Sequence, residues 1–516
     1  MTVAATRSAP RADRGPELRR LAFGGAANLV GAGYAGLAGF AVAAVVARGL
    51  SPEDAGVFFT ATASFVVVAV VAKLGTPTGL VFWLARLRTQ HRSDLIRRCL
   101  AIALRPVLVA SLVLAVLGWA VAVWLPEPLA TQIRVLALAV PFAAISDGLL
   151  AATRAFHRMR TTVLVEKLGR PTLQLATLVA AVWWGAGLSW YTVAWAAPWL
   201  VTVGFAWRAL RRLVPPGRRP GHPLYPGRDR EPGRDREPEV GGKPALARAF
   251  WTFTWPRGAA NLIALLWQRL DVVLVAGLAG FAPAAGYAVA TRFTVLGQLG
   301  NTAIGNATEP RLAEAVARGD TDAARRLYQT ATGWLVLVTW PAYLLTASFA
   351  ALYLSVFGPE YVTTETVTVV VLVCAAMLLA SSCGMVDVVL AMVGRTTQNL
   401  ANVSAALLIT TGLNLLLTPR IGMLGAAIAW AAAMATKNLL PLCQLATRHR
   451  LHPYGVATVT AAGLATVCFG VCPLVLVWLL GPGVMTFLIA AALGAAGYLV
   501  GVWAFRAPLR LTWGKR

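Results

Sequence analysis

Apolar stretches long enough to cross a lipid bilayer recur along nearly the whole chain, and this feature constrains the fold more than any other. About 20 apolar residues in a helix span a hydrocarbon core about 30 Å thick, and in lipid the backbone polar groups must bond within the segment. The sequence therefore predicts an all-α polytopic membrane protein with about 14 transmembrane helices. The predicted spans are 21–47, 56–84, 99–124, 131–152, 161–185, 190–212, 249–277, 283–307, 330–357, 364–393, 398–418, 422–446, 454–480 and 483–505.

Composition and charge agree with a membrane protein and argue against nucleic acid as a partner. Charged residues make up 13% of the chain, against about 25% in a soluble domain. The formal net charge of +25 arises from short basic clusters between apolar stretches, as in the cytoplasmic loops of polytopic proteins. The six cysteines show no metal-ligand spacing, so we expect neither a metal nor a cofactor.

Lysine and arginine are distributed unevenly between alternate loops. If the N-terminus is cytoplasmic, 38 of the 46 Lys and Arg residues lie in inner segments, whereas the outer connections hold three, Arg48, Arg134 and Arg420. Because positive residues favour the cytoplasmic side, we expect a multi-pass protein of the cytoplasmic cell membrane with both termini inside.

A repeated pentapeptide indicates two copies of one unit. GAANL occurs at 25–29 and again at 258–262, and AGVFFTATASF at 55–65 resembles AGYAVATRF at 285–293. Six spans is an even number, so two six-helix units keep the same orientation and are related by a pseudo-twofold axis along the membrane normal. We therefore expect a site between the two units.

These observations predict six segments. The stretch GRDREPGRDREP, rich in Pro, Gly and paired charges, is typical of a disordered linker. The predicted segments are a cytoplasmic N-terminal tail (1–20), a first six-helix bundle (21–212), a disordered cytoplasmic linker (213–246), a second six-helix bundle (247–446), helices 13 and 14 (447–505) and a cytoplasmic C-terminal tail (506–516).

Two segments resemble a known family. ARGLSPEDAGVF at 47–58 resembles the loop between helices 1 and 2 of Wzx-type oligosaccharide flippases, the polysaccharide transporters of the MOP superfamily. RLDVVLVAGLAGFAPAAGYAVATRF at 269–293 is similar to the helix 7–8 segment of that family. In topology the likeness covers essentially the whole chain, and in letters it covers these segments and the surroundings of GAANL.

The resemblance implies a V-shaped cavity between two bundles, lined by helices 1, 2, 7 and 8. It also implies alternating access that carries an undecaprenyl-pyrophosphate-linked oligosaccharide to the outer leaflet for cell-surface polysaccharide biosynthesis, with polysaccharide polymerase or assembly proteins as possible partners. Helices 13 and 14 would be additional elements, as in MurJ-type lipid II flippases. The helix 1 arginine associated with that branch has no counterpart here, since helix 1 carries no Arg before Arg48.

Polar side chains inside the predicted spans are the candidate site residues, because an Arg, Lys or Asp in the bilayer costs about 2.5–3.5 kcal/mol. At about 100° per residue, Arg257, Asn261, Gln268 and Asp271 fall within about 80° of one another on one helix and form a polar stripe. Arg269 lies about 120° from Arg257 and is expected to face the same cavity from its edge. The candidate substrate-binding residues are Arg257, Arg269, Lys73, Arg292, Asn261, Gln268, Asn28, Gln298 and Asn301.

We interpret these residues as a hydrophilic, cationic cavity. The cations would attract a pyrophosphate, which suits the planar fork of arginine, while the amides hydrogen-bond sugar. Asp271 is expected to orient an arginine. The alternative is that these groups only pair with one another, or hydrogen-bond between helices. Glu166–Lys167 and Asp387–Arg395 are interpreted as interface or gate contacts.

Other function classes fit less well. The chain contains no HExxH, P-loop, GxSxG or paired acidic motif, so we expect no enzyme, and a membrane glycosyltransferase would need a larger soluble face. A MATE-type drug or ion antiporter that exports cations would need acidic groups in its cavity, whereas the charges within the predicted spans are mainly positive. A MurJ-like lipid II flippase and a scaffold for polysaccharide assembly stay open, as do the energy source and the identity of the glycan.

Overall fold

The computed structural model describes residues 15–90, 92–156, 159–214 and 242–510, and in these ranges it contains helices and no strands. Most of the predicted linker and parts of both predicted tails lie outside them. Ten of the described helices are long and apolar enough to cross a membrane. Each of the fourteen predicted spans is helical, although several are broken or merged, which confirms an all-α polytopic membrane protein.

The first six passages are α1 (Gly15–Gly49), α2 (Pro52–Lys73) with α3 (Thr76–Thr89), α4 (Ser93–Val121), α5 (Leu129–Ala155), α6 (Met159–Thr162) with the π-helix η2 (Val163–Gly169) and α7 (Arg170–Trp183), and α8 (Leu188–Ala196) with α9 (Pro198–Arg211). The others are α10 (Gly242–Ala279), α11 (Phe281–Ala290) with α12 (Val295–Ala317), α13 (Thr321–Ser348) with α14 (Ala350–Ser355), α15 (Thr364–Cys383) with α16 (Val386–Met392), both arms of α17 (Thr396–His449), α18 (Val456–Thr466) with α19 (Cys472–Leu480), and α20 (Val484–Ala504).

The two longest departures from regular helix have local causes. Between α2 and α3, Leu74 and Gly75 have φ values of 50° and 74°, and Pro77 follows in the first turn of α3, where its missing N–H costs no helical hydrogen bond. In α17, Asn402 and Gln444 exchange amide hydrogen bonds of 3.0 and 3.1 Å. A straight helix would separate them by about 63 Å, so α17 is a hairpin that reverses at Gly422, whose φ is 60°.

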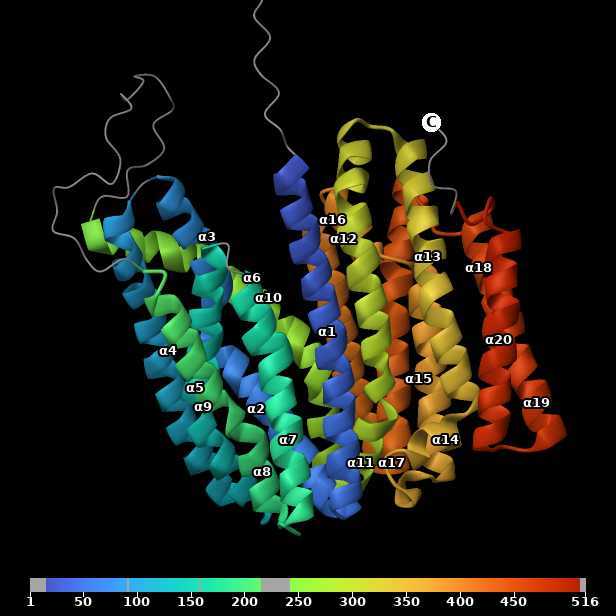
Figure 1. Cartoon of the computed structure of the whole chain (residues 1–516), viewed down its shortest axis with the longest axis horizontal. Coiled ribbons are helices and arrows are strands. Elements are labelled where there is room, and N and C mark those ends of the chain that lie inside the picture. The colour runs from blue at the N-terminus through green and yellow to red at the C-terminus, as the bar shows by residue number, and fades with distance from the viewer. Residues whose placement is uncertain (1–14, 91, 157–158, 215–241, 511–516) are drawn as a thin grey trace, which may run out of the picture.

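The helices form two groups that approach each other at the bottom of Figure 1 and diverge toward the top. The helices from α2 to α9, with α1 packed against α7, make up one group and those from α11 to α17 the other, while α18 to α20 pack along α13. Helix α10 is shared between the groups. Leu246 and Phe250 in its first half are buried with residues of α3, α4 and α5, whereas its second half contacts α17.

The lower end in Figure 1 is closed by contacts between the two groups, and we call it the closed end. A Cβ atom on Gly56 of α2 would lie 1.8 Å from the carbonyl oxygen of Phe281, so the two backbones touch there. Arg48 at the end of α1 donates hydrogen bonds of 2.7 and 3.1 Å to the carbonyls of Val356 and Ser355, which follow and end α14. The predicted topology would make this the outer end.

Candidate functional site

A cavity of about 330 Å³ lies beside the break between α2 and α3, and we call it the charged cavity. Lys73, Asp147, Arg154 and Glu166 are among its lining residues. Lys73 forms an ion pair with Asp147, and Nη1 of Arg170 lies 4.0 Å from Oδ1 of the same carboxylate. Asp147 in α5 is therefore the common partner of cations from α2 and α7.

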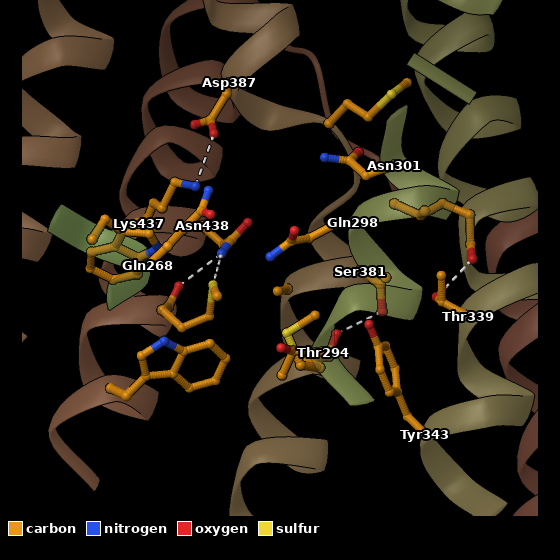
Figure 2. A pocket seen from close by; sticks show the side chains of 18 of the residues that line it. Gln268, Thr294, Gln298, Asn301, Thr339, Tyr343, Ser381, Asp387, Lys437 and Asn438 are labelled. Atoms are coloured by element: carbon orange, nitrogen blue, oxygen red, sulfur yellow. Dashed lines mark hydrogen bonds and ion pairs between the residues drawn. The ribbon is translucent and has the colours of Figure 1, made fainter. Parts of the chain in front are cut away.

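A second cavity of about 430 Å³ lies in the other group of helices, and we call it the amide cavity. Figure 2 shows Gln268, Gln298, Asn301 and Asn438 around it, from α10, α12 and α17. Two indoles, Trp267 and Trp430, also line it, and the ion pair between Lys437 Nζ and Asp387 Oδ2, 3.4 Å long, lies at one end. Its character is thus mainly neutral, hydrogen-bonding and aromatic.

The break between α15 and α16 forms part of the amide cavity. Gly384 has a φ of 71°, and a Cβ there would lie 2.1 Å from Oγ1 of Thr332, so both the conformation and the close packing require glycine. The segment around the break lines the cavity. Non-helical backbone at membrane depth is tolerated where it lines such a space.

Five of the nine predicted substrate-binding residues line these cavities. Lys73 and Asn261 line the charged cavity, Gln298 and Asn301 line the amide cavity, and Gln268 lines both. Because Gln268 belongs to both linings, the two cavities are neighbours. Asn28 lies in α1, but its side chain is outside the part of the chain that the structure describes.

Arg257 lies on the same face of α10 as Asn261 and Gln268, one turn beyond the charged cavity. It is exposed, as are those two residues. Its guanidinium carbon lies 3.8 Å from the centre of the Phe253 ring, and Nη1 donates to the Phe253 carbonyl at 3.1 Å. The predicted stripe therefore exists, but the end of its arginine is turned back onto its own helix.

Arg269 and Arg292 are in neither cavity lining. Both lie about 15 Å from the closed end along neighbouring helices, and they are close enough for their charges to interact. The guanidinium of Arg292 lies 5.2 Å from the centre of the Phe59 ring. The Nε atoms of both arginines are buried without a hydrogen-bond partner, and among the described residues neither arginine forms an ion pair.

The contacts of Asp271 differ from the role predicted for it. Tyr287 Oη and Thr410 Oγ1 each lie 3.4 Å from a different oxygen of its carboxylate, and the side chain lines the amide cavity. Within the described ranges no arginine pairs with it, so the prediction that Asp271 orients an arginine does not match the structure. The hydroxyl partners come from α11 and α17, and helical periodicity within α10 carries no information about them.

The acidic residues correct the expectation of a uniformly cationic cavity. Asp147 was not among the predicted residues. It lies within the predicted span 131–152, so the cost of a charge in the bilayer, which singles out Asp271, is the signal that identifies it. Asp387 pairs with Lys437 instead of Arg395, while Glu166 does contact Lys167, at 3.2 Å. The cations of both cavities are thus accompanied by carboxylates.

The chain matches two family profiles and several solved structures. The profile described as polysaccharide biosynthesis protein matches residues 22–316, and the profile described as MatE matches residues 256–420. A search of curated proteins found no match to this sequence.

Among solved structures, lipid II flippase MurJ in an inward closed conformation is similar, with a TM-score of 0.68, 11% identity, and coverage of 92% of this chain and 98% of that chain. An inward-facing multidrug resistance MATE family transporter has a TM-score of 0.60 and 15% identity, with coverage of 81% and 96%. A MOP superfamily transporter from Pyrococcus furiosus has a TM-score of 0.51 and 15% identity, with coverage of 84% and 97%. At these identities the likeness establishes a shared fold.

Proposed function

Because the chain belongs to the polysaccharide biosynthesis protein family of the MOP superfamily, we propose that it is a flippase for a lipid-linked oligosaccharide. Its cargo is an oligosaccharide joined through pyrophosphate to undecaprenol. It carries this cargo across the cytoplasmic membrane by alternating access, for cell-surface polysaccharide biosynthesis. Both termini are on the cytoplasmic side in this proposal, which makes the closed end extracellular.

The observation that carries the proposal is the contact between two chemically different cavities through Gln268. Lysine and arginine of the charged cavity suit the oxygens of a pyrophosphate. The side chains of the amide cavity both donate and accept hydrogen bonds, which matches the hydroxyls of a sugar. One ligand with an anionic part and a saccharide part would therefore occupy both spaces.

The pairing of charges supports an anionic cargo over a cationic one. A drug antiporter of the MATE type needs carboxylates that are free to bind a cation. Asp147 and Asp387 are already engaged by lysines, whereas Arg269 and Arg292 have no carboxylate partner among the described residues. Asp271 also has no cation partner there, and its two oxygens lie 3.4 Å from the hydroxyls of Tyr287 and Thr410. Among these buried unpaired groups of the described residues, two arginines thus stand against one carboxylate.

Deleting the gene in its native host tests the cargo directly. We expect undecaprenyl-pyrophosphate-linked oligosaccharide to accumulate on the inner face of the membrane, measured by lipid extraction and mass spectrometry. Re-expression of the wild-type chain should clear it. Accumulation of lipid II instead would assign the MurJ-like alternative, and increased sensitivity to cationic drugs with no lipid intermediate would assign the antiporter.

The amide cavity gives a second test. We expect the double substitution Gln298→Ala and Asn301→Ala to lower transport of the lipid-linked oligosaccharide about tenfold or more, since each lost hydrogen bond is worth about 0.5–1.5 kcal/mol. Binding of undecaprenyl pyrophosphate without sugar should change little. Gln90→Ala, an exposed amide outside both cavities, is the control. Equal loss for both ligands would contradict a saccharide site.

A further inference from the structure

Asp147 is surrounded by more positive charge than it can neutralise. Lys73 from α2 forms an ion pair with it, Arg170 from α7 lies 4.0 Å away, and Arg154 from its own helix is close enough for the charges to interact. These residues come from three separate passages. Glu166 also lines the charged cavity but is paired with Lys167. The group of Asp147 with its three cations therefore carries a net charge of +2.

The contacts within this group are incomplete. Oδ1 of Asp147 and Nε of Arg154 are buried without a hydrogen-bond partner. The guanidinium of Arg170 is 4.1 Å from the centre of the Trp199 ring, so the indole supports one face of it while the carboxylate reaches only an edge. Buried polar atoms normally have a hydrogen-bond partner. The two atoms without one belong to Asp147 and Arg154, which both line the charged cavity.

A pyrophosphate diester has the chemistry that this group lacks. It carries two ionised oxygens, so its charge of −2 would balance the net +2 of the group. Its oxygens also supply more acceptors than one carboxylate, and arginine binds such oxygens through paired hydrogen bonds. A sugar linked through a single phosphate carries only one negative charge and would leave the group unbalanced.

We propose that Asp147 is a resident counter-anion that limits how tightly the three cations hold the pyrophosphate of the cargo. This inference rests on the flippase function proposed above. Without cargo, Asp147 keeps Lys73, Arg154 and Arg170 together in a partly buried site. With cargo, it stays beside the pyrophosphate as a like charge, which weakens binding and speeds release on the other side of the membrane. Asp147 is a positioning residue in this scheme and does not contact the sugar.

The test is binding of undecaprenyl pyrophosphate to the full chain in lipid nanodiscs, with undecaprenol as the uncharged comparison. We expect Asp147→Asn to bind undecaprenyl pyrophosphate about tenfold more tightly, because a repulsive charge within several ångströms is removed, and to transport the lipid-linked oligosaccharide more slowly. We expect Lys73→Met to bind it more weakly. Undecaprenol should bind all forms equally.

The double variant Asp147→Asn with Lys73→Met distinguishes an electrostatic effect of Asp147 on binding from a role of the ion pair in stabilising the fold. It has the wild-type net charge without the ion pair, so its affinity should lie between those of the two single variants, and it keeps the test open if Asp147→Asn alone does not fold. Weaker binding by Asp147→Asn, or a double variant weaker than both single variants, would show that Asp147 only holds the bundle together. If the wild-type chain does not bind undecaprenyl pyrophosphate, the proposed function itself is overturned.

Discussion

Replacing Arg292 with methionine is expected to stabilise the protein and to lower transport about 100-fold. The guanidinium lies against the Phe59 ring with its Nε atom unbonded, and no described carboxylate pairs with it. A charge at this depth costs about 2.5–3.5 kcal/mol, and methionine keeps the packing volume without the charge. We expect the unfolding temperature to rise by about 2–4 °C. A residue that destabilises the resting state is retained when function requires it.

The loss of transport follows from the place of Arg292 behind the closed end. Phe59 belongs to α2 and covers Arg292, so separation of α2 from α11 would uncover Arg292, whose charge interacts with that of Arg269. We expect these arginines to hold the pyrophosphate when the closed end opens, and transport by Arg292→Met to fall about 100-fold if a bidentate phosphate contact is lost.

Thermal unfolding and proteoliposome transport check the two effects together. Arg134→Met is the matched control, because Arg134, near the start of α5, is already paired with Glu127, and we expect it to change neither quantity appreciably. A lower unfolding temperature for Arg292→Met would mean that the arginine stabilises the resting structure, and unimpaired transport would remove it from the site.

The amino-acid sequence predicts the elements of this fold well because each depends on local information. The length of an apolar stretch fixes a span, and Pro77 with Gly75 marks the break after α2. The polar stripe of α10 follows from helical periodicity, and Asn261, Gln268 and Asp271 do line the cavities.

The contacts of a charged side-chain end group depend on tertiary structure and could not be predicted. Arg257 has a long, flexible side chain whose end turns back onto Phe253, although its Cα lies on the predicted face. Asp147 meets Lys73 and Arg170 only because α2, α5 and α7 pack together. Periodicity gives the direction in which a residue leaves its helix, and the partner is supplied by segments distant in sequence.

Substituting valine for Gly56 is expected to force the closed end open and to block transport. The new Cβ would lie 1.8 Å from the carbonyl oxygen of Phe281 and 2.9 Å from its Cα, and backbone atoms cannot rotate away as a side chain would. Overpacking of this kind costs about 1–3 kcal/mol, and a bias of that size shifts a two-state equilibrium about 5–150-fold. The variant should therefore populate the state in which α2 has separated from α11.

Spin labels at Ser51 and Glu360 measure this change, since both residues are exposed, with Ser51 at the start of α2 and Glu360 shortly after the end of α14. We expect their distance distribution to lengthen in Gly56→Val and transport to fall in proportion. Gly187→Val is the matched control, because no atom lies within 4 Å of its added Cβ.

Arg48→Ala removes two hydrogen bonds across the same end without a clash and should shift the distances in the same direction by less. If Gly56→Val keeps the short distance and full transport, the close approach of α2 and α11 does not control access from this end.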